Sequence, residues 1–596
     1  MAYRTPLDDL RFLLHELVDF PAAVSDPEMM TQELALTIWE EAGKFAAGVL
    51  SPLNACGDRS GLSLEDGVVT TPDGFAAAWQ QLIANGWNNM ALPESIGGQG
   101  LPWMISTLAT EMFSSANKSF TMCPGLTQGA IEAIYAAGSD ELKQKYLPKM
   151  VAGEWTGTMN LTEPQAGSDV GAIRTRAMPQ ADGSYRIKGQ KIFISFGEHD
   201  LADNIIHLVL ARTPDAPAGV RGISLFLVPK FLVNDDGSLG ERNDLVCAAL
   251  EHKLGIHASP TAVMAFGEQD GAIGYLVGEE NKGLAAMFVM MNMARLAVGI
   301  EGLASAEAAL QLAWAYALER VQGATPAEPG KPAVIAEHPD VRRMLMLMQS
   351  RTRAMRAMAM VIAEAQDMHE NHADAEVRQQ QQKFVELMIP VFKAWATESG
   401  VEVASLGIQI HGGMGFVEET GAAQIWRDAR ISPIYEGTTG IQAQDLIGRK
   451  LYRDKGETFA LLVSRMRETV TAMQGNGLNT LATKLAVAIN SLESTAAAVM
   501  KRCADDMPLA QLMSVPFLMM FGHVAGGWLL GRCALAARFH QNGEEYPAAQ
   551  LASWLQSADF YCRYSLAEVA GMERQVMNYL ADDADACLPD IPEVGD

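Results

Sequence analysis

The spacing of apolar residues changes twice along the chain, and each change marks an expected domain boundary. In residues 7–150 apolar side chains recur every three or four positions, as in FAAAWQQLIANGW, which predicts amphipathic helices. Between about 155 and 280 the period shortens to two, β-branched residues accumulate, and Gly and Asp-Gly turns separate the segments. We therefore predict an all-helical domain at 1–155 and a β domain at 156–280.

Helical periodicity returns after the β domain and continues almost to the C-terminus. We expect long helices at residues 283–323, 340–371, 376–406 and 441–452. Four such helices side by side form a bundle. The Pro-, Gly- and Ala-rich segment 323–340 between the first two is expected to be an exposed loop. The chain would then continue from a bundle domain at 281–452 into a helical extension at 453–580 and an acidic tail at 581–596.

Size, charge and cysteine content narrow the classes of function. A chain of 596 residues exceeds one hydrophobic core and can enclose a large cofactor. Its formal net charge of -26 opposes contact with nucleic acid, whose binding depends on Lys and Arg displacing counterions. The 7 cysteines include no CxxC pair, and the N-terminus lacks the basic and apolar regions of a signal peptide. We expect no disulfide, no metal site, no nucleic-acid partner and a cytoplasmic location.

One segment, 515–531, is apolar enough to raise the alternative of a membrane span. Its length approaches the ~20 residues that cross a bilayer. Pro516 and His523 interrupt it, and its glycines have the four-residue spacing that lets two helices approach closely. We predict a buried packing helix, with peripheral membrane contact as the less favoured alternative.

Two segments at the start of the β domain offer groups that suit a polar ligand. In TMNLTEPQAGSDVGA, 158–172, glycines lie beside the hydroxyls of Thr162 and Ser168, and flexible backbone can present N–H groups to a phosphate or a heteroaromatic ring. In the strand KIFIS, Phe193 and Ser195 share one face and offer an aromatic wall and a hydroxyl. An ordinary capped turn and a core phenylalanine are the structural alternatives.

Two later segments combine glycines with ionisable side chains. IQIHGGMGF, 408–416, ends a helix in glycines that allow close approach to the backbone, and His411 within it is expected to cap or pack rather than to catalyse. IYEGTTGIQ, 434–442, places one carboxylate, Glu436, between apolar and aromatic neighbours and a Gly-Thr-Thr-Gly run. An isolated glutamate in a loop is by default a surface acid.

Five segments, in this order, resemble the acyl-CoA dehydrogenases: LTEPQAGSD, KIFIS, ALERVQG, QIHGGMGF and YEGTTGIQ. The resemblance covers roughly residues 40–450. It implies a multidomain α+β fold with an N-terminal all-α domain, a central β-barrel-like domain and a C-terminal four-helix bundle, here followed by an extra helical extension. It also implies a flavoprotein of fatty acid β-oxidation that binds FAD. The extension looks like the long branch of the family, which includes dehydrogenases of 3-methylmercaptopropionyl-CoA and of fatty acyl-CoA.

The resemblance also implies residue roles. Glu436 matches the base that removes the α-proton of the acyl thioester while the β-hydrogen leaves as hydride to flavin N5, which forms a trans 2,3-double bond. Desolvation by apolar neighbours and substrate raises the basicity of such a carboxylate. The Glu436 N–H and a flavin ribityl hydroxyl would polarise the thioester carbonyl. The positions matched to FAD contacts are Met159, Leu161, Thr162, Gly167, Ser168, Phe193, Ser195, Arg320, Gln409, Gly413 and Thr438. Those matched to substrate contacts are Ser168, Asn292, Arg295, Tyr435 and Gly437.

Arg320, Gln409 and Gly413 match groups that reach the FAD of a neighbouring subunit, which implies a homodimer or higher homo-oligomer. An alternative for Arg320 is a helix C-terminal cation that offsets the dipole, and one for Arg295 is a structural salt bridge. The chain departs from the family at 321–323, where Val-Gln-Gly replaces a common Lys-Thr-Phe, and at Met159, where a tyrosine is common.

The resemblance leaves three functions open. A dehydrogenase passes its electrons to an electron-transferring flavoprotein, whereas an acyl-CoA oxidase of similar fold passes them to oxygen. Other members of the superfamily bind DNA through a C-terminal extension, but the extension here is net acidic, which opposes that reading. Long-chain, short-chain and thioether acyl groups all remain candidates for the substrate.

Overall fold

The computed structural model describes residues 3–580, apart from the side chains of residues 288–292. The predicted acidic tail, 581–596, lies outside the described residues. The chain forms two compact units. We call Met1–Thr5 with Ile38–Glu301 the sheet unit, and Pro6–Thr37 with the chain from Gly302 onward the helical unit.

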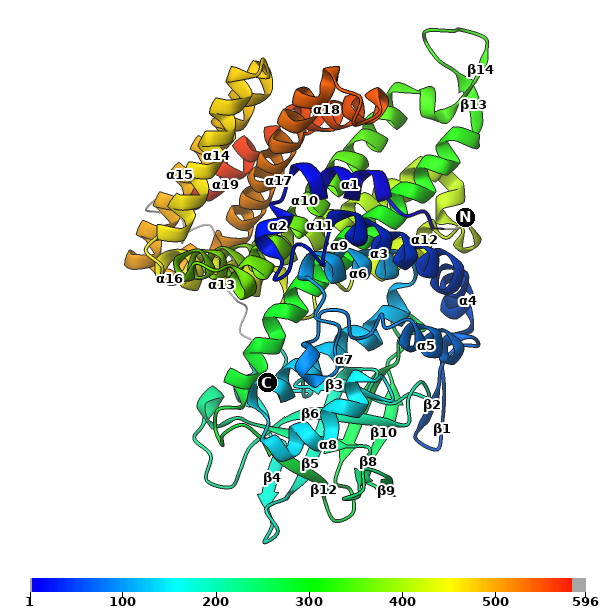
Figure 1. The fold of residues 1–596 in the computed structure, drawn as a ribbon, viewed down its shortest axis with the longest axis vertical. Coiled ribbons are helices and arrows are strands. Elements are labelled where there is room, and N and C mark those ends of the chain that lie inside the picture. Colours follow the sequence, from blue (N-terminus) through cyan, green and yellow to red (C-terminus); the bar gives the residue numbers. More distant parts are fainter. Residues whose placement is uncertain (1–2, 581–596) are drawn as a thin grey trace, which may run out of the picture. The chain divides into compact units, whose positions relative to one another are not determined.

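The sheet unit is built on an 8-stranded sheet with the strand order β10-β11-β5-β12-β7-β6-β3, and β4 pairs with β5 (Figure 1). β3 runs parallel to β6, and the other paired strands of this sheet are antiparallel. The strand bounds are β3 Trp155–Asn160, β4 Arg176–Pro179, β5 Tyr185–Ser195, β6 Asn204–Ala211, β7 Ser224–Pro229, β10 Leu245–Leu250, β11 Thr261–Phe266 and β12 Ala272–Val277. Beside it, β8 (Phe231–Val233) and β9 (Leu239–Arg242) form a hairpin. The β domain expected from period-two alternation is therefore present.

Helices cover one side of this sheet. Ala130 and Ile134 of α7 and Met150 of α8 share a buried core with Trp155 and Ile206 of the sheet. Apolar residues at helical spacing on α7 and α8 thus meet the inward face of the strands. The helices of this part of the chain are α3 Gln32–Phe45, α4 Ser51–Ser60, α5 Phe75–Ala84, α6 Trp103–Ala116, α7 Lys118–Ala137 and α8 Asp140–Val151.

The first domain is helical, as predicted, apart from one hairpin that the sequence did not predict. β1 (Ser63–Glu65) and β2 (Val68–Thr70) form a hairpin between α4 and α5. Asp66 has φ 50° and Gly67 has φ 77°, so the two residues between the strands both adopt the left-handed conformation. This backbone suits the twist of a tight hairpin and explains the Asp-Gly pair.

The helical unit contains the bundle and the extension. After the long α9 (Gly283–Glu319), which starts in the sheet unit, come α10 Pro339–Asn371, α11 Ala375–His411, α12 Ala422–Ala429 and α13 Thr439–Asp445. The extension comprises α14 Glu457–Gly475, α15 Asn479–Asp505, α16 Met507–Leu512, α17 Ser514–Phe539, α18 Ala548–Arg563 and α19 Val569–Tyr579. One local prediction was wrong, because the expected loop 323–340 contains a hairpin of β13 (Val321–Ala324) and β14 (Pro332–Val334). The expected helix at 441–452 is present as α13 followed directly by a π-helical segment, Leu446–Tyr452.

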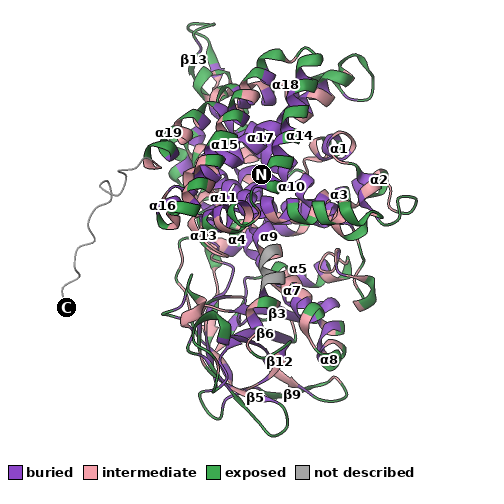
Figure 2. Ribbon diagram, turned by 90° about the vertical axis from the view of Figure 1, so that its left-hand side faces the viewer, coloured by how far each residue is buried: buried purple, intermediate pink, exposed green. Residues whose placement is uncertain are grey.

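The apolar segment 515–531 lies in α17, which is a buried packing helix as predicted (Figure 2). Two helices, Met293–Glu319 and Ser514–Asn542, are long and apolar enough to cross a membrane by composition, but their most apolar windows are 67% and 83% buried inside the protein. A Cβ atom at Gly522 would overlap the ring of Trp395 on α11, and one at Gly526 would lie 2.6 Å from the Tyr561 hydroxyl. The glycines therefore serve close helix packing.

The N-terminal segment packs within the helical unit rather than with the other N-terminal helices. It contains α1 (Leu7–Glu16) and α2 (Phe20–Ala23). Asp9 forms a two-pronged ion pair with Arg353 of α10, with both N–O distances 2.9 Å. Such paired, charge-assisted hydrogen bonds fix orientation as well as contact.

Candidate functional site

The loop that follows β3 is organised by a buried ion pair. Lys191 Nζ donates to Glu163 Oε1 at 2.8 Å and to the Leu161 carbonyl at 3.0 Å, and both charged side chains are at most 3% exposed. Glu163 also accepts from the Arg174 N–H and from the N–H and hydroxyl of Thr175. Burial opposes ionisation of Glu163, but the Lys191 charge and these hydrogen bonds lower its pKa to about 2. The ion pair and these hydrogen bonds therefore fix the conformation of the loop.

The structure joins this loop to the strand that carries the predicted aromatic wall. The Ile192 N–H donates to the Thr162 carbonyl at 3.0 Å, which ties the loop to β5. Phe193 is 59% exposed and has φ 59°, a left-handed conformation that is unusual for a bulky residue. Backbone strain of this kind persists where the surroundings impose it, and it clusters at functional sites.

The polar groups of β5 and of the loop after β3 suit a bound ligand. Within the described part of the chain, the hydroxyls of Thr162, Ser168 and Ser195 make no hydrogen bond. A Cβ atom at Gly167 would meet open space. Met159 differs from this group, because its side chain is 8% exposed and belongs to the core beneath the sheet.

Of the two predicted substrate positions on α9, one can be placed. Arg295 is buried, with 5% exposure. The side chain of Asn292 lies outside the described residues.

The loop that carries Glu436 lies between α12 and α13 and has an unusual backbone. Glu436 has φ 54° and Gly437 has φ 89°, so both are left-handed. A Cβ atom on Gly437 would lie 2.7 Å from the side-chain nitrogen of Gln442, which leaves room only for glycine. For glutamate this conformation is strained, and such strain at a loop carboxylate indicates a functional residue.

Two buried side chains hold this conformation. Lys393 of α11 is fully buried, and its Nζ donates to the Gly437 carbonyl at 2.7 Å. Gln442 of α13, also fully buried, donates to the Glu436 carbonyl at 3.1 Å. Thr438 caps α13 by accepting from the Ile441 N–H at 3.3 Å. The backbone of Glu436 is thus fixed, while its side chain and that of Tyr435 are half-buried.

The residues matched to a neighbouring subunit's cofactor come together at one end of the helical unit. Tyr316 near the end of α9 stacks on His411 at the end of α11, with ring centroids 4.4 Å apart. Arg320, Gln409 and Gly413, around these two helix ends, are exposed. Phe416 nearby is 88% exposed, which leaves a large apolar side chain in solvent. His411 itself is buried, and its Nδ1 pairs with the Gly407 carbonyl at 2.7 Å.

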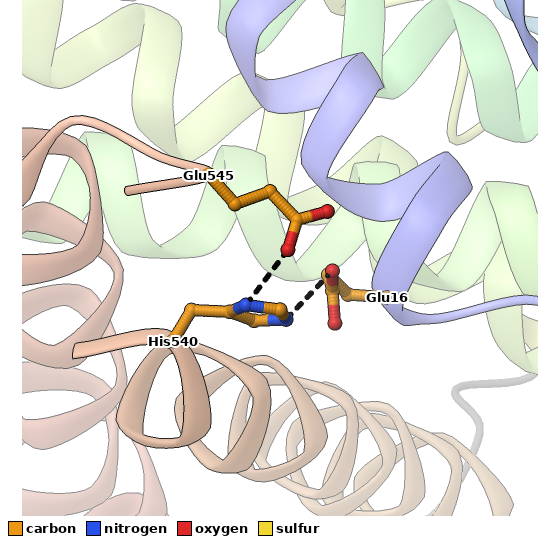
Figure 3. A group of neighbouring side chains, drawn as sticks. All are labelled: Glu16, His540 and Glu545. Atoms are coloured by element: carbon orange, nitrogen blue, oxygen red, sulfur yellow. Dashed lines mark ion pairs between the residues drawn. The ribbon is translucent and has the colours of Figure 1, made fainter. Parts of the chain in front are cut away.

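One cluster elsewhere in the helical unit brings together side chains that can bind metal ions, Glu16, His540 and Glu545 (Figure 3). His540 uses Nε2 toward Glu16 and Nδ1 toward Glu545, each at 3.0 Å. The two carboxylates therefore meet different ring nitrogens, whereas a metal centre needs one nitrogen and both carboxylates around one point. The geometry is that of an imidazole bridging α1 to the chain that follows α17.

Family models match four consecutive parts of the chain. They are the acyl-CoA dehydrogenase N-terminal domain at 34–154, its middle domain at 158–268, its C-terminal domain at 281–451, and an acetyl-CoA dehydrogenase C-terminal like domain at 462–584. The chain is also 46% identical over 588 residues to 3-methylmercaptopropionyl-CoA dehydrogenase of Ruegeria pomeroyi, which covers 97% of this chain and 98% of that protein. This chain belongs to the acyl-CoA dehydrogenase family.

Other relatives agree with this membership. The chain is 37% identical over 559 residues to the broad-specificity linear acyl-CoA dehydrogenase FadE5 of Mycobacterium tuberculosis, covering 90% of each protein. An acyl-CoA dehydrogenase from Bacillus anthracis complexed with FAD superposes with a TM-score of 0.75 at 21% identity, over 98% of this chain and 93% of that one. Caenorhabditis elegans ACDH-11 in complex with C11-CoA gives 0.74 at 20% identity, over 97% and 95%. These two structures confirm the multidomain fold.

As an acyl-CoA dehydrogenase, the protein is an oxidoreductase whose cofactor is FAD. The residues of the sheet unit fit that cofactor, because an exposed aromatic ring, hydroxyls without internal partners and an open glycine lie on or near one strand and its neighbouring loop. Sequence reasoning missed the side chains that hold the two loops. Glu163 and Lys191 were inside quoted motifs, whereas nothing local in the sequence distinguishes Lys393.

Proposed function

We propose that this acyl-CoA dehydrogenase forms a trans 2,3-enoyl-CoA and that Glu436 is its catalytic base. The observation that carries the proposal is the left-handed backbone of Glu436, fixed by Lys393 and Gln442. The backbone at Glu436 is therefore fixed before the substrate arrives. Only the side chain has to adjust for the carboxylate to meet a carbon acid. Together with the match of 434–442 to the family motif, this favours a base over a surface acid.

In this proposal the protein groups act on the acyl thioester. The carboxylate of Glu436 takes the proton from the α-carbon, and its backbone N–H donates to the thioester carbonyl, on which negative charge develops. Gly437 keeps the backbone open beside the base, and Tyr435 flanks it. The chemistry that bound FAD would supply is acceptance of the β-hydrogen as hydride.

The residues proposed to hold FAD lie in both units. In the sheet unit, Phe193 would pack on the ring system, and Thr162 and Ser195 would supply hydroxyls. Leu161, Gly167 and Ser168 would contribute from the loop. Thr438 would lie near the adenosine half. We assign Met159 no side-chain contact, because that side chain is in the core.

We propose 3-methylmercaptopropionyl-CoA, or another short acyl-CoA of similar shape, as the substrate. The support is the identity of 46% across nearly the whole of both chains with the Ruegeria pomeroyi enzyme of that name. The broad-specificity linear acyl-CoA dehydrogenase of Mycobacterium tuberculosis, at 37% identity, makes longer linear acyl groups the alternative.

The proposed partners are a second copy of the chain and an electron-transferring flavoprotein, in the cytoplasm. Exposed Arg320, Gln409 and Gly413 lie around the α9 and α11 ends, where Phe416 leaves an apolar ring in solvent. An arginine suits a pyrophosphate by bidentate pairing, so Arg320 would reach the FAD of the second copy. Cross-linking through cysteines introduced at Gly413 would report a dimer.

The test of the base is Glu436→Gln, with Glu419→Gln, an exposed acid in the same unit, as the matched control. We expect the first variant to retain FAD and to bind acyl-CoA, with kcat about 10²–10⁴-fold lower, which is the usual contribution of a general base. Dye-coupled assays over an acyl-CoA panel that includes 3-methylmercaptopropionyl-CoA would measure it. Normal flavin bleaching by Glu436→Gln would remove this residue as the base. Peroxide formation without an added acceptor would instead identify an oxidase.

A further inference from the structure

A partly open cavity of about 390 Å³ is lined by residues of the helical unit. Its lining side chains come from α10, α11, α14 and α17. Part of its wall is apolar, formed by the buried side chains of Val361, Phe384 and Trp528. This volume is at the lower end of the range for small-molecule sites, so the cavity suits a ligand of a few carbon atoms or one ring.

Two charged residues of this cavity, Glu364 and Arg532, attract each other electrostatically but do not lie within ion-pair distance. Glu364 of α10 accepts from the Asp19 N–H at 2.6 Å, and Arg532 of α17 donates to the Leu17 carbonyl at 2.6 Å. Among the described residues, neither side chain makes an ion pair. Each is therefore anchored by one backbone group of the N-terminal segment and keeps hydrogen-bonding capacity toward the cavity. Burial removes the hydration of the Arg532 guanidinium and lowers its pKa, and the charge of Glu364 offsets only part of that cost.

A second guanidinium lines the mouth of the cavity. Arg465 of α14 is exposed, and in the part of the chain that the structure describes its side chain makes no hydrogen bond or ion pair. Arg467, two residues further along the same helix, instead pairs with Glu493 at 2.5 Å. Arg465 also acts electrostatically on Arg532, so the two positive charges lie close enough to repel each other. Glu364 attracts both arginines and offsets part of that repulsion, and a further anion between them would relieve the rest.

The acids of the cavity do not oppose an anion. Burial raises the pKa of Glu364 to about 7, against the effects of the Asp19 N–H and the charges of Arg532 and Arg465. A carboxyl group that is protonated in part at neutral pH can donate a hydrogen bond to an anion rather than repel it. Glu468, the other acid, is exposed, where water screens its charge.

We propose that this cavity binds a small organic carboxylate. The carboxylate group pairs with Arg465 and Arg532, the preferred partners of planar anions, and the apolar body packs against Phe384 and Trp528. The lining of this cavity includes none of the residues proposed to bind acyl-CoA or FAD.

Isothermal titration of the FAD-loaded full chain at fixed ionic strength tests this proposal. The probes are butyrate, benzoate and inorganic phosphate, and the variants are Arg465→Gln and the matched Arg467→Gln on the same helix. We expect saturable binding of butyrate or benzoate to one site per chain, weakened at least about tenfold by Arg465→Gln and unchanged by Arg467→Gln.

Phosphate shares the charge but lacks the apolar body, so we expect it to bind more weakly than either carboxylate. The melting temperature of each variant without a probe checks that the fold is intact, which is expected because both arginines are exposed. Three results would overturn the proposal: no saturable carboxylate binding, equal weakening by both variants, or phosphate binding as tightly as the carboxylates.

Discussion

Replacement of Lys191 by methionine tests whether the Glu163–Lys191 pair supports the proposed FAD loop. The substitution keeps the length and apolar stem of the side chain but removes the ammonium group. It would leave Glu163, 3% exposed, as a buried carboxylate without its counter-ion. Removing one partner of a buried ion pair typically costs about 3–5 kcal/mol.

The structure places the expected value near the lower end of that range. Glu163 would keep hydrogen bonds from the Arg174 N–H at 2.6 Å, from the Thr175 hydroxyl at 2.6 Å and from Gln165 Nε2 at 2.7 Å. These donors stabilise the remaining charge, so we expect a loss of about 3 kcal/mol in the free energy of unfolding. The Leu161 carbonyl would lose its Lys191 donor, and we expect weaker FAD retention as well.

Urea unfolding, followed by circular dichroism and by flavin fluorescence, measures both effects. Lys149→Met is the matched control, because Lys149 pairs with Glu154 at 2.9 Å while the two side chains stay 40% and 50% exposed, and exposed pairs contribute about 0–1 kcal/mol. The double variant Glu163→Gln/Lys191→Met removes both charges and should recover part of the loss. A loss for Lys191→Met no larger than that for Lys149→Met would refute the reasoning.

Three further predictions concern the helical unit. Gly522→Ala would force a methyl group into the ring of Trp395 and lower the free energy of unfolding by about 1–3 kcal/mol. The control is Gly571→Ala, whose Cβ would meet open space, and in thermal melts it should be neutral or stabilising. Burial raises the pKa of Glu364 to about 7, so the folded state favours the protonated carboxyl group. This contribution to stability is complete below pH 4.5 and is lost as the pH rises through about 7. The melting temperature of Glu364→Gln relative to wild type should therefore increase from pH 4.5 to 7, and a constant difference would contradict this sign. Lys393→Met should lower kcat roughly tenfold or more with FAD content unchanged, and an unaltered kcat would exclude a positioning role.

The sequence predicted the elements where the periodicity was long. The helix expected at 340–371 is observed as Pro339–Asn371, and the strand KIFIS is the end of β5. The prediction was wrong where pairing overrode the local pattern. α9 ends at Glu319 rather than near residue 323, because Val321–Ala324 pairs with Pro332–Val334. A short hairpin gives too few residues for a period to be recognised.

In the candidate site too, local sequence indicated some features and not others. The motif around Glu436 located the carboxylate, and the motif around Phe193 located the aromatic ring, because these residues are close in sequence to the glycines or strand that present them. Nothing in those motifs indicated the left-handed backbone of either residue. Backbone conformation at such positions depends on partners that the surrounding structure supplies.

The sequence by itself determined the order of the main helical and β regions, because that order depends on local spacing and side-chain type, and its motifs identified the family by resemblance. Only the tertiary structure decided that Lys393 meets the Gly437 carbonyl, that Lys191 meets Glu163, and that residues 6–37 pack with the C-terminal helices. These contacts join positions far apart in the chain. Their formation depends on burial and on satisfying buried polar groups within a packed interior, which local periodicity does not specify.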